Sequence, residues 1–224
     1  MTPPRPASPY LVPGFYDRAL AQGRHREIVG GRWDETGRAQ MAALFGAGLV
    51  PSDRLLDVGA GALRLGRLAV PYLEPGRYWA TDASRALLLR GREVELADPG
   101  RLPVGRLIED DAFAYPGVPD GIDMAIAFAV FTHLPADRLA TALANARSRF
   151  PRLRAFLFTV FVAPAGAGPV RQADGVVTHP DRPPYHLPMD AVATIAAGAG
   201  FEVRPRDRVL PRGQRLFEAR PLTT

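Results

Sequence analysis

The sequence predicts a single α/β domain with an open, doubly wound, mostly parallel sheet of seven strands and an N-terminal helical extension. Three observations support this fold class. Short apolar runs alternate with segments of helical periodicity from residue 55 onward. Most of these runs are apolar on both faces, as in parallel strands that helices cover on both sides. The links between several of them are short, which favours right-handed strand–helix–strand units.

Length and composition limit the class of protein. The chain has 224 residues, enough for one domain whose core needs no disulfide or metal. The absence of cysteine excludes disulfides, thiolate zinc sites and a thiol nucleophile. The net charge is +5, but all 28 basic residues are arginines scattered among acids, so nucleic acid is not the expected partner. With no signal-peptide core and no long apolar run, we expect a cytoplasmic protein without membrane contact. The sequence does not predict the oligomeric state.

Residues 1–48 are expected to form an extended arm and a helical lid, and residues 49–224 the sheet domain. Five prolines among the first 13 residues exclude a helix or an interior strand there. Residues 15–22 are expected to form a short helix, and residues 34–48 a second helix that ends at two glycines. A glycine-bearing link joins these two helices.

The sheet domain is expected to begin with five strands, at residues 55–58, 78–81, 105–109, 124–130 and 155–162. A sixth strand is expected from residue 201 and a seventh at residues 213–221, the last antiparallel at or near an edge. Apolar residues spaced i, i+3, i+4 and i+7 predict helices around residues 65–72, 139–146 and 192–199.

One connection, residues 163–188, is long and rich in proline and glycine. Connections beyond about 12–15 residues in compact domains are usually functional or disordered. Because this one follows the fifth strand, we expect it to emerge at the carboxyl edge of the sheet. Ligands bind at that edge in open α/β sheets.

A glycine turn between two acids is the clearest sign of a ligand. Gly59 and Gly61 follow the first strand in "DVGAGALRLG", where they allow a sharp turn and close approach of the backbone to a ligand. Asp82 ends the second strand and can accept hydrogen bonds from ribose hydroxyls. A dinucleotide fingerprint would need a third glycine where Arg64 stands, and Asp57 would repel a pyrophosphate. A cationic ligand suits both acids, and a purely structural turn is the alternative.

The segments "LLDVGAGALRLG", "ATDAS", "EDDAF" and "IDMAIAFAVFTHLP" together resemble the Rossmann-like class I S-adenosylmethionine-dependent methyltransferases. The resemblance covers Arg54 to about Ala219. The segments "HREIVGGRWDETGRAQ", "THPDRPPYH" and "LPRGQRLFEA" resemble a group of stand-alone bacterial enzymes of this class. The resemblance implies S-adenosylmethionine as cofactor, S-adenosylhomocysteine as product and methyl transfer as the reaction.

The resemblance also implies cofactor contacts. The glycine turn would line the methionine and ribose of the cofactor, and Asp82 would bind the ribose hydroxyls. Residues after the third strand would surround the adenine, and the end of the fourth strand would face the sulfonium. Many members have a third glycine where this chain has Leu63, and the next residue, Arg64, could bind the cofactor's carboxylate, pair with Asp57 or lie in solvent. Trp33, in the lid expected over the cofactor, and Asp57, before the glycine turn, are further candidate cofactor-binding residues. The implied contacts are Gly59, Ala60 and Gly61, then Asp82 and Ala83, then Asp111, Ala112 and Phe113, then Ala127 to Val130 with Phe128.

A hydroxyl group that accepts a methyl group must lose its proton, and histidine is the side chain that most often serves as the base. His133, in "VFTHLP", either serves the site or bonds the backbone of a turn that begins a helix. His179 and His186 lie in the long connection, which we expect to form the acceptor side, with one of them as the base. A polar loop that only binds to the sheet is the alternative. Three neighbours are candidate substrate-binding residues: Asp181, Arg182 and Tyr185.

Absences narrow the acceptor. Without cysteine there is no covalent thiol route to a pyrimidine carbon. Enzymes that methylate amino groups of bases or glutamine resemble one another in an N/D-P-P-Y/F-type sequence at the end of the fourth strand, where this chain has "AFAVF". The same segment has no acid of the kind that metal-assisted catechol methylation would need. No histidine spacing is typical of zinc, so no metal is expected. We expect O-methylation of a small-molecule hydroxyl, on a sugar or secondary metabolite. The alternatives are an NAD(P)-dependent oxidoreductase, an RNA-directed methyltransferase and a non-catalytic cofactor-binding module.

Overall fold

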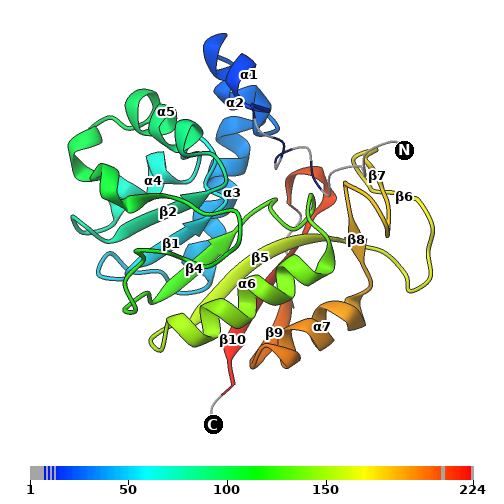
Figure 1. The fold of residues 1–224 in the computed structure, drawn as a ribbon. Helices are drawn as coiled ribbons and strands as arrows, with labels where there is room; N and C mark the ends of the chain where they lie inside the picture. The colour runs from blue at the N-terminus through cyan, green and yellow to red at the C-terminus, as the bar shows by residue number, and fades with distance from the viewer. Residues whose placement is uncertain (1–7, 9, 11, 13, 208–209, 223–224) are drawn as a thin grey trace.

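The computed structural model describes residues 8, 10, 12, 14–207 and 210–222. The expected extended arm therefore lies mostly outside the described residues. Figure 1 shows a central sheet with helices on both faces. No helix in these described ranges is both long and apolar enough to cross a membrane. The helices are α1 (Asp17–Ala21), α2 (His25–Ile28), α3 (Trp33–Gly46), α4 (Gly66–Tyr72), α5 (Arg85–Glu95), α6 (Ala136–Arg149) and α7 (Met189–Gly198).

The main sheet has the order β3-β2-β1-β4-β5-β10-β9, and β8 pairs with the end of β5. Strands β1 to β5 are parallel neighbours, whereas β10 is antiparallel to both β5 and β9. The predicted mostly parallel α/β sheet is confirmed, and its antiparallel last strand lies next to the edge strand. The strands are β1 (Leu55–Val58), β2 (Tyr78–Asp82), β3 (Leu107–Glu109), β4 (Met124–Ala127), β5 (Ala155–Val162), β6 (Val170–Arg171), β7 (Val177–Thr178), β8 (His186–Leu187), β9 (Phe201–Arg206) and β10 (Arg215–Pro221).

The strand order reverses between β1 and β4. Chain order leads outward from β1 to β2 and β3, and then returns to place β4 on the other side of β1. In open α/β sheets, ligands bind in the crevice outside the carboxyl ends of the strands at such a switch point. The topology therefore indicates where a ligand site should lie.

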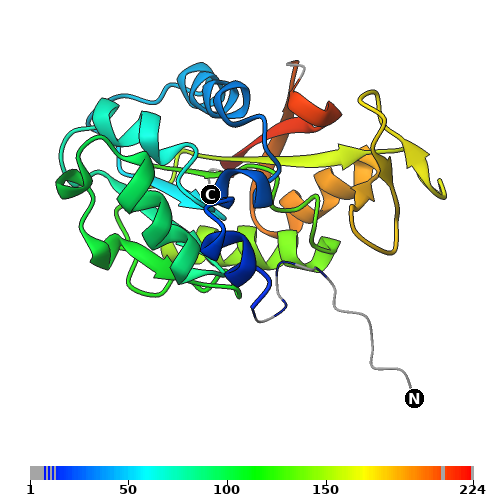
Figure 2. The same cartoon turned by 90° about the horizontal axis from the view of Figure 1, so that it is seen from above.

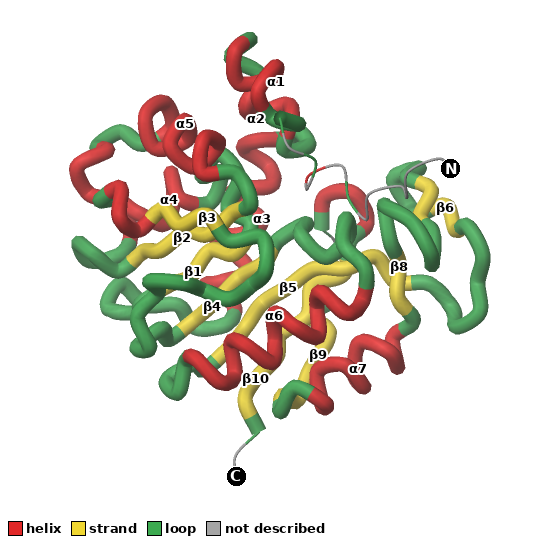
Figure 3. The backbone as a smooth tube through the Cα atoms, viewed as in Figure 1, coloured by secondary structure: helices red, strands yellow, loops and turns green. Residues whose placement is uncertain are grey.

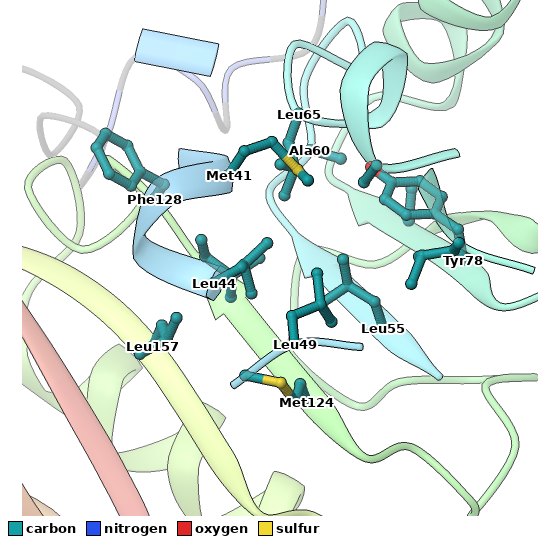
Figure 4. Close-up of a cluster of buried hydrophobic side chains, with 14 of the residues drawn as sticks. Met41, Leu44, Leu49, Leu55, Ala60, Leu65, Tyr78, Met124, Phe128 and Leu157 are labelled. Atoms are coloured by element: carbon teal, nitrogen blue, oxygen red, sulfur yellow. The ribbon is translucent and has the colours of Figure 1, made fainter. Parts of the chain in front are cut away.

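Helices cover both faces of the sheet (Figure 2). Leu55 of β1 packs into a core shared with α3, α4 and α5, and the next residue, Leu56, into a core shared with α6 and α7. Figure 4 shows the first core, where Met41 of α3 lies among side chains that include Met124 and Leu157 of neighbouring strands. Because both faces are buried, the strand ends are the part of the sheet left to contact ligands.

The structure contains elements that the sequence patterns did not indicate. Helix α5 connects β2 and β3, and α2 lies within the expected glycine-bearing link. The connection 163–188 contains the paired strands β6 and β7, and then β8, so it is folded (Figure 3). The Tyr185 N–H donates to the Thr132 carbonyl at 2.8 Å, beside the end of β4. This places the connection at the carboxyl edge of the sheet, as predicted.

Candidate active site

A cavity of about 320 Å³ lies at the carboxyl ends of the parallel strands. Its glycine-turn end is lined by the turn after β1 and the loops after β2 and β3. Its β5 end is lined by the loop after β4, the end of β5, the 163–188 connection and the short turn Pro211–Gly213 between β9 and β10. Residues from the N-terminal segment, between Ser8 and Gln40, contribute the remaining wall.

The glycine turn brings the backbone of residues 59–61 to the cavity surface. Gly59 has φ +69°, and a Cβ there would overlap Val130 Cγ2. Gly61 has φ +56°, and a Cβ there would lie 3.1 Å from Val29 Cγ1. Both positions therefore need glycine, for conformation and for space. Leu63, where the resemblance expects a glycine, also has a left-handed φ of +60°, and its side chain is fully buried.

Asp82 ties the end of β2 to the glycine turn. Its Oδ2 accepts the Gly61 N–H and its Oδ1 accepts the Ser84 N–H, both at 2.9 Å. Burial raises the pKa of Asp82 to about 6, against the opposing effect of these two hydrogen bonds. A carboxylate can accept about four hydrogen bonds. Asp82 therefore keeps acceptor capacity for a ligand in the cavity.

Asp57 does not line the cavity. It is buried under the glycine turn, where the Tyr78 hydroxyl donates to its Oδ2 at 2.6 Å. Burial, together with the nearby charge of Asp82, raises the pKa of Asp57 to about 7, against the opposing effects of Tyr78 and Arg64. Asp57 therefore supports the turn from below and does not contact the cavity.

The loop after β3 is shaped by Asp110. Its carboxylate accepts backbone N–H bonds from Ala112, Ala114 and Tyr115. This curls the chain so that Phe113, with φ +58°, lines the cavity. Of the residues predicted to surround the adenine, Asp111, Phe113 and Ala83 line the cavity and Ala112 does not.

His133 is the only one of the histidines predicted as catalytic that lines the cavity. Its ring lies edge-on to the ring of Tyr10, with centroids 4.8 Å apart. Burial, together with the positive charge of Arg212, lowers the pKa of His133 to about 4. The imidazole is therefore neutral near pH 7 and can accept a hydrogen bond or a proton.

The histidines of the long connection lie elsewhere. His186 is buried, and its Nδ1 is 2.9 Å from the Thr178 hydroxyl oxygen. The backbone of His179 bridges to that of Tyr185. Neither histidine lines the cavity, and neither do the other predicted substrate-binding residues, Asp181, Arg182 and Tyr185. The connection instead contributes Val176 and Pro184 to the β5 end.

Trp33 opens α3 and lies beneath the cavity wall rather than in it. Its ring packs with Ala62 and Leu87. The guanidinium carbons of Arg26 and Arg64 lie 5.2 and 5.3 Å from the ring centroid. The residue therefore joins the N-terminal helices to the glycine turn.

Helix α2 is fastened to α5 by a buried carboxylate. The Glu95 side chain is 2% exposed, and its Oε1 lies 2.6 Å from both His25 Nε2 and Arg26 Nε. Burial acts to raise the pKa of Glu95, but the bonds to Arg26 and His25 outweigh it and lower the pKa. This contact fixes the link that supplies Val29 and Gly30 to the cavity wall.

We expect Glu95→Gln to lower the free energy of unfolding by about 1–3 kcal/mol, because a buried charge pair loses one partner. S-Adenosylhomocysteine binding should weaken several-fold as residues 29 and 30 shift. Chemical denaturation and calorimetric titration would measure the two effects. Glu93→Gln, on the same helix with a side chain 70% exposed, is the matched control and should change neither. Equal behaviour of the two variants would contradict the fastening role.

Three polar side chains that face the cavity stand out from the rest. Arg64 Nη2 donates to the Val29 carbonyl, and Arg212 Nη2 donates to the Gly30 carbonyl at 2.6 Å. Gln40 is buried on α3, and its Oε1 has no hydrogen-bond partner among the described residues. An unpaired buried acceptor is costly unless a ligand satisfies it.

Sequence reasoning did not find several cavity residues. They come from segments distant in the chain that only the fold brings together, and Gln40 and Arg212 had no local pattern that marked them. The signal was that Gln40 ends "HREIVGGRWDETGRAQ" and Arg212 lies in "LPRGQRLFEA", two segments that carried the resemblance. The lining residues without an earlier prediction include Ser8, Tyr10, Tyr16, Thr36, Gln40, Phe161, Val176, Pro184, Pro211, Arg212 and Gln214.

The fold and the cavity define a Rossmann-like α/β protein with a cavity at the switch point of its sheet. More narrowly, the fold is that of the class I S-adenosylmethionine-dependent methyltransferases. No protein-family model and no curated protein matches the chain.

The chain is similar to solved methyltransferase structures at low sequence identity. One is magnesium protoporphyrin IX methyltransferase (ChlM) from Synechocystis PCC 6803 with bound SAM, at 16% identity and TM-score 0.63, over 99% of this chain and 100% of that one. A second is an S-adenosylmethionine-dependent methyltransferase from Clostridium acetobutylicum ATCC 824, at 12% identity and TM-score 0.62, over 92% and 99%. A third is mitomycin 7-O-methyltransferase MmcR, at 17% identity and TM-score 0.59, over 92% and 60%.

Proposed function

We propose that this protein is an S-adenosylmethionine-dependent methyltransferase that methylates an oxygen of a small molecule. The observation that carries the proposal is the arrangement of Asp82. Its carboxylate lies at the end of β2, accepts the Gly61 N–H, and borders a cavity that the backbone of residues 59–61 also lines. A ribose bound across this corner would have its hydroxyls met by a fixed carboxylate.

The residues present fit the cofactor. Asp82 would hold the ribose, and Ala83, Asp111 and Phe113 would surround the adenine. At the other end, the amide oxygen of Gln40 would accept from an ammonium group, and Arg64 would bind a carboxylate. When bound, the cofactor supplies a methyl group already activated by a sulfonium. The protein's part is to align the acceptor oxygen and to exclude water.

The acceptor side is the β5 end of the cavity. The solved structures similar to this chain include mitomycin 7-O-methyltransferase, which supports oxygen as the methylated atom. His133 would accept a hydrogen bond from the acceptor hydroxyl and take its proton, because it is the predicted histidine that lines the cavity. The roles predicted for His179, His186 and their loop neighbours remain predictions from the sequence.

The titration of His133 tests this role. We expect its imidazole to titrate near pH 4 in the folded protein, well below the usual value of about 6.5. The base form would then persist through mild acid, so methyl transfer should not fall between about pH 8 and 6 on account of this group. His133→Ala should slow methyl transfer about 10- to 100-fold, since a base of low pKa contributes less than one matched to the working pH.

Histidine NMR spectra of the wild type and of His133→Asn would assign and measure this pKa. The other three histidines serve as internal controls in the same spectra. A His133 signal that titrates near pH 6.5 would contradict its burial beside a cation, and unchanged turnover in His133→Ala would remove it from the reaction.

Calorimetric titration with S-adenosylmethionine, S-adenosylhomocysteine and NAD⁺ tests the function itself. We expect binding of the first two, with micromolar affinity that is typical of such sites, and none of NAD⁺. Binding of NAD⁺ alone would favour the oxidoreductase alternative. Absence of binding by all three would leave a structural turn as the better interpretation.

A further inference from the structure

The cavity contains two guanidinium groups without a counter-ion. Arg64 and Arg212 donate to the consecutive carbonyls of Val29 and Gly30, so their head groups approach the same short link. Burial and the charge of Arg212 lower the pKa of Arg64 to about 10, against the opposing charge of Asp57. Among the described residues, neither arginine has a carboxylate within the 4.0 Å of an ion pair. Like charges this close favour a bound anion.

The proposed cofactor accounts for only one of these cations. S-Adenosylmethionine has a single carboxylate, and Arg64 stands directly after the glycine turn, on the same side of the cavity as Gln40. Arg212 lies on the turn between β9 and β10, at the β5 end. Arg212 lines the cavity together with His133 of the loop after β4 and Phe161 of β5, which we assign to the acceptor side.

Arg212 is exposed, and it lines both the cavity and a surface groove that it shares with Arg38 and Asp174. Leu134, Phe161, Val176 and Pro184 line the same end of the cavity. We propose that this end binds an acceptor with an apolar body and an anionic group, and that Arg212 is the residue that recognises the anion. The inference rests on the proposed methyltransferase function, and it narrows the acceptor from any small hydroxyl compound to an acidic one.

The chemistry of the guanidinium suits this role. One of its five N–H donors is used on Gly30, which leaves a fork for a carboxylate, phosphate or phosphonate. Arg212 has a left-handed φ of +66°, so the turn holds it in a conformation that an arginine adopts only when the surrounding structure requires it. The bond to Gly30 then directs the remaining donors.

Ligand-observed NMR on the protein saturated with S-adenosylhomocysteine tests the inference. The probes are benzoate and phenylphosphonate, with benzamide as the neutral analogue of the same shape. We expect saturable signals from at least one acid and about tenfold weaker binding of benzamide. Arg212→Gln should weaken the acid about tenfold and leave benzamide unchanged, and Arg212→Lys should recover part of the loss.

Arg38→Gln is the matched control, because Arg38 is exposed on α3 and borders the surface groove that Arg212 also lines, but does not line the cavity. It removes the same charge and should leave acid binding as in the wild type. Benzoate and phenylphosphonate distinguish a carboxylate from a phosphoryl site.

Three outcomes would overturn the inference: no acid binding in the wild type, equal binding of acid and amide, or equal losses in Arg212→Gln and Arg38→Gln. A tenfold loss of S-adenosylhomocysteine affinity in Arg212→Gln would also overturn it, by assigning Arg212 to the cofactor. Calorimetry with S-adenosylhomocysteine on the wild type separates these results from failure of the proposed function. If that ligand does not bind, the function fails; if it binds and the acids do not, only the inference fails.

Discussion

Replacing Asp82 with asparagine is expected to weaken S-adenosylhomocysteine binding about 100-fold, which corresponds to ~2.7 kcal/mol. Hydrogen bonds to a charged acceptor contribute about 1.5–3 kcal/mol each, and the ribose would lose the charged partner of its hydroxyls. An asparagine amide group would also turn an N–H₂ toward one of the two backbone donors, Gly61 or Ser84, that now bond to the carboxylate. Calorimetric titration measures the affinity directly.

The pH dependence of binding gives an independent check on Asp82. In the unliganded protein its pKa is about 6, chiefly because it is buried. A ribose is held best by the ionised form, so the proton must leave on binding. Affinity should be constant well above pH 6 and should fall about tenfold per pH unit well below it. The Asp82→Asn variant should show no such slope.

Asp111→Asn is the control for Asp82. Asp111 also lines the cavity but is exposed, so water replaces much of what it loses, and we expect a change of less than about tenfold. The thermal midpoint of Asp111→Asn should stay near that of the wild type, whereas Asp82→Asn should lower it, because the backbone N–H of Gly61 or Ser84 loses its acceptor. An affinity loss of the same size in both variants would contradict a special role for Asp82.

Replacing Gly91 with alanine is expected to lower the free energy of unfolding by about 3 kcal/mol, or the thermal midpoint by about 10 °C. Gly91 lies in α5 where the helix contacts the glycine turn, and a Cβ there would overlap the Ala62 backbone, with Ala62 Cα only 2.8 Å away. Backbone cannot move aside as a side-chain rotamer can. The higher helix propensity of alanine, worth about 1 kcal/mol, offsets only part of this cost.

The same substitution should weaken S-adenosylhomocysteine binding about tenfold or more, because any relief of the overlap displaces the turn at Gly61. Gly198→Ala is the matched control: this residue is also helical, in α7, and a Cβ there would meet nothing within 4 Å. It should leave binding unchanged and keep or slightly raise stability. A Gly91→Ala protein as stable as Gly198→Ala would show that α5 packs less tightly on the turn.

The parts of the fold that the sequence predicted are those with a local signature. The strands β1, β2, β4 and β5 are apolar on both faces, and the turn at Gly59 and Gly61 follows a strand directly. Helix α5 was missed because five of the eleven residues in "RALLLRGREVE" are arginine or glutamate, and an internal glycine interrupts the apolar pattern. That glycine has a packing reason, contact with Ala62, which a single sequence does not reveal.

The site divides in the same way. Residues that follow a strand within one motif, such as Asp82 and Phe113, were predicted and line the cavity. Gln40 and Arg212 reach it from a helix before the sheet and from a turn near its end, so their proximity depends on tertiary structure. His179 and His186 were predicted from the composition of their loop; neither lines the cavity, and their predicted roles stay untested.

The position of β10 between β5 and β9 also constrains how the molecule is assembled. During synthesis, the strong apolar strand Ala155–Val162 leaves the ribosome well before its partner Arg215–Pro221. Until that partner arrives, one side of β5 is an open edge, which is the feature most prone to pair with other chains. The sheet is therefore completed by an internal strand that is synthesised late. A nascent chain halted before residue 215 would expose the edge of β5, and we expect chaperones to bind it.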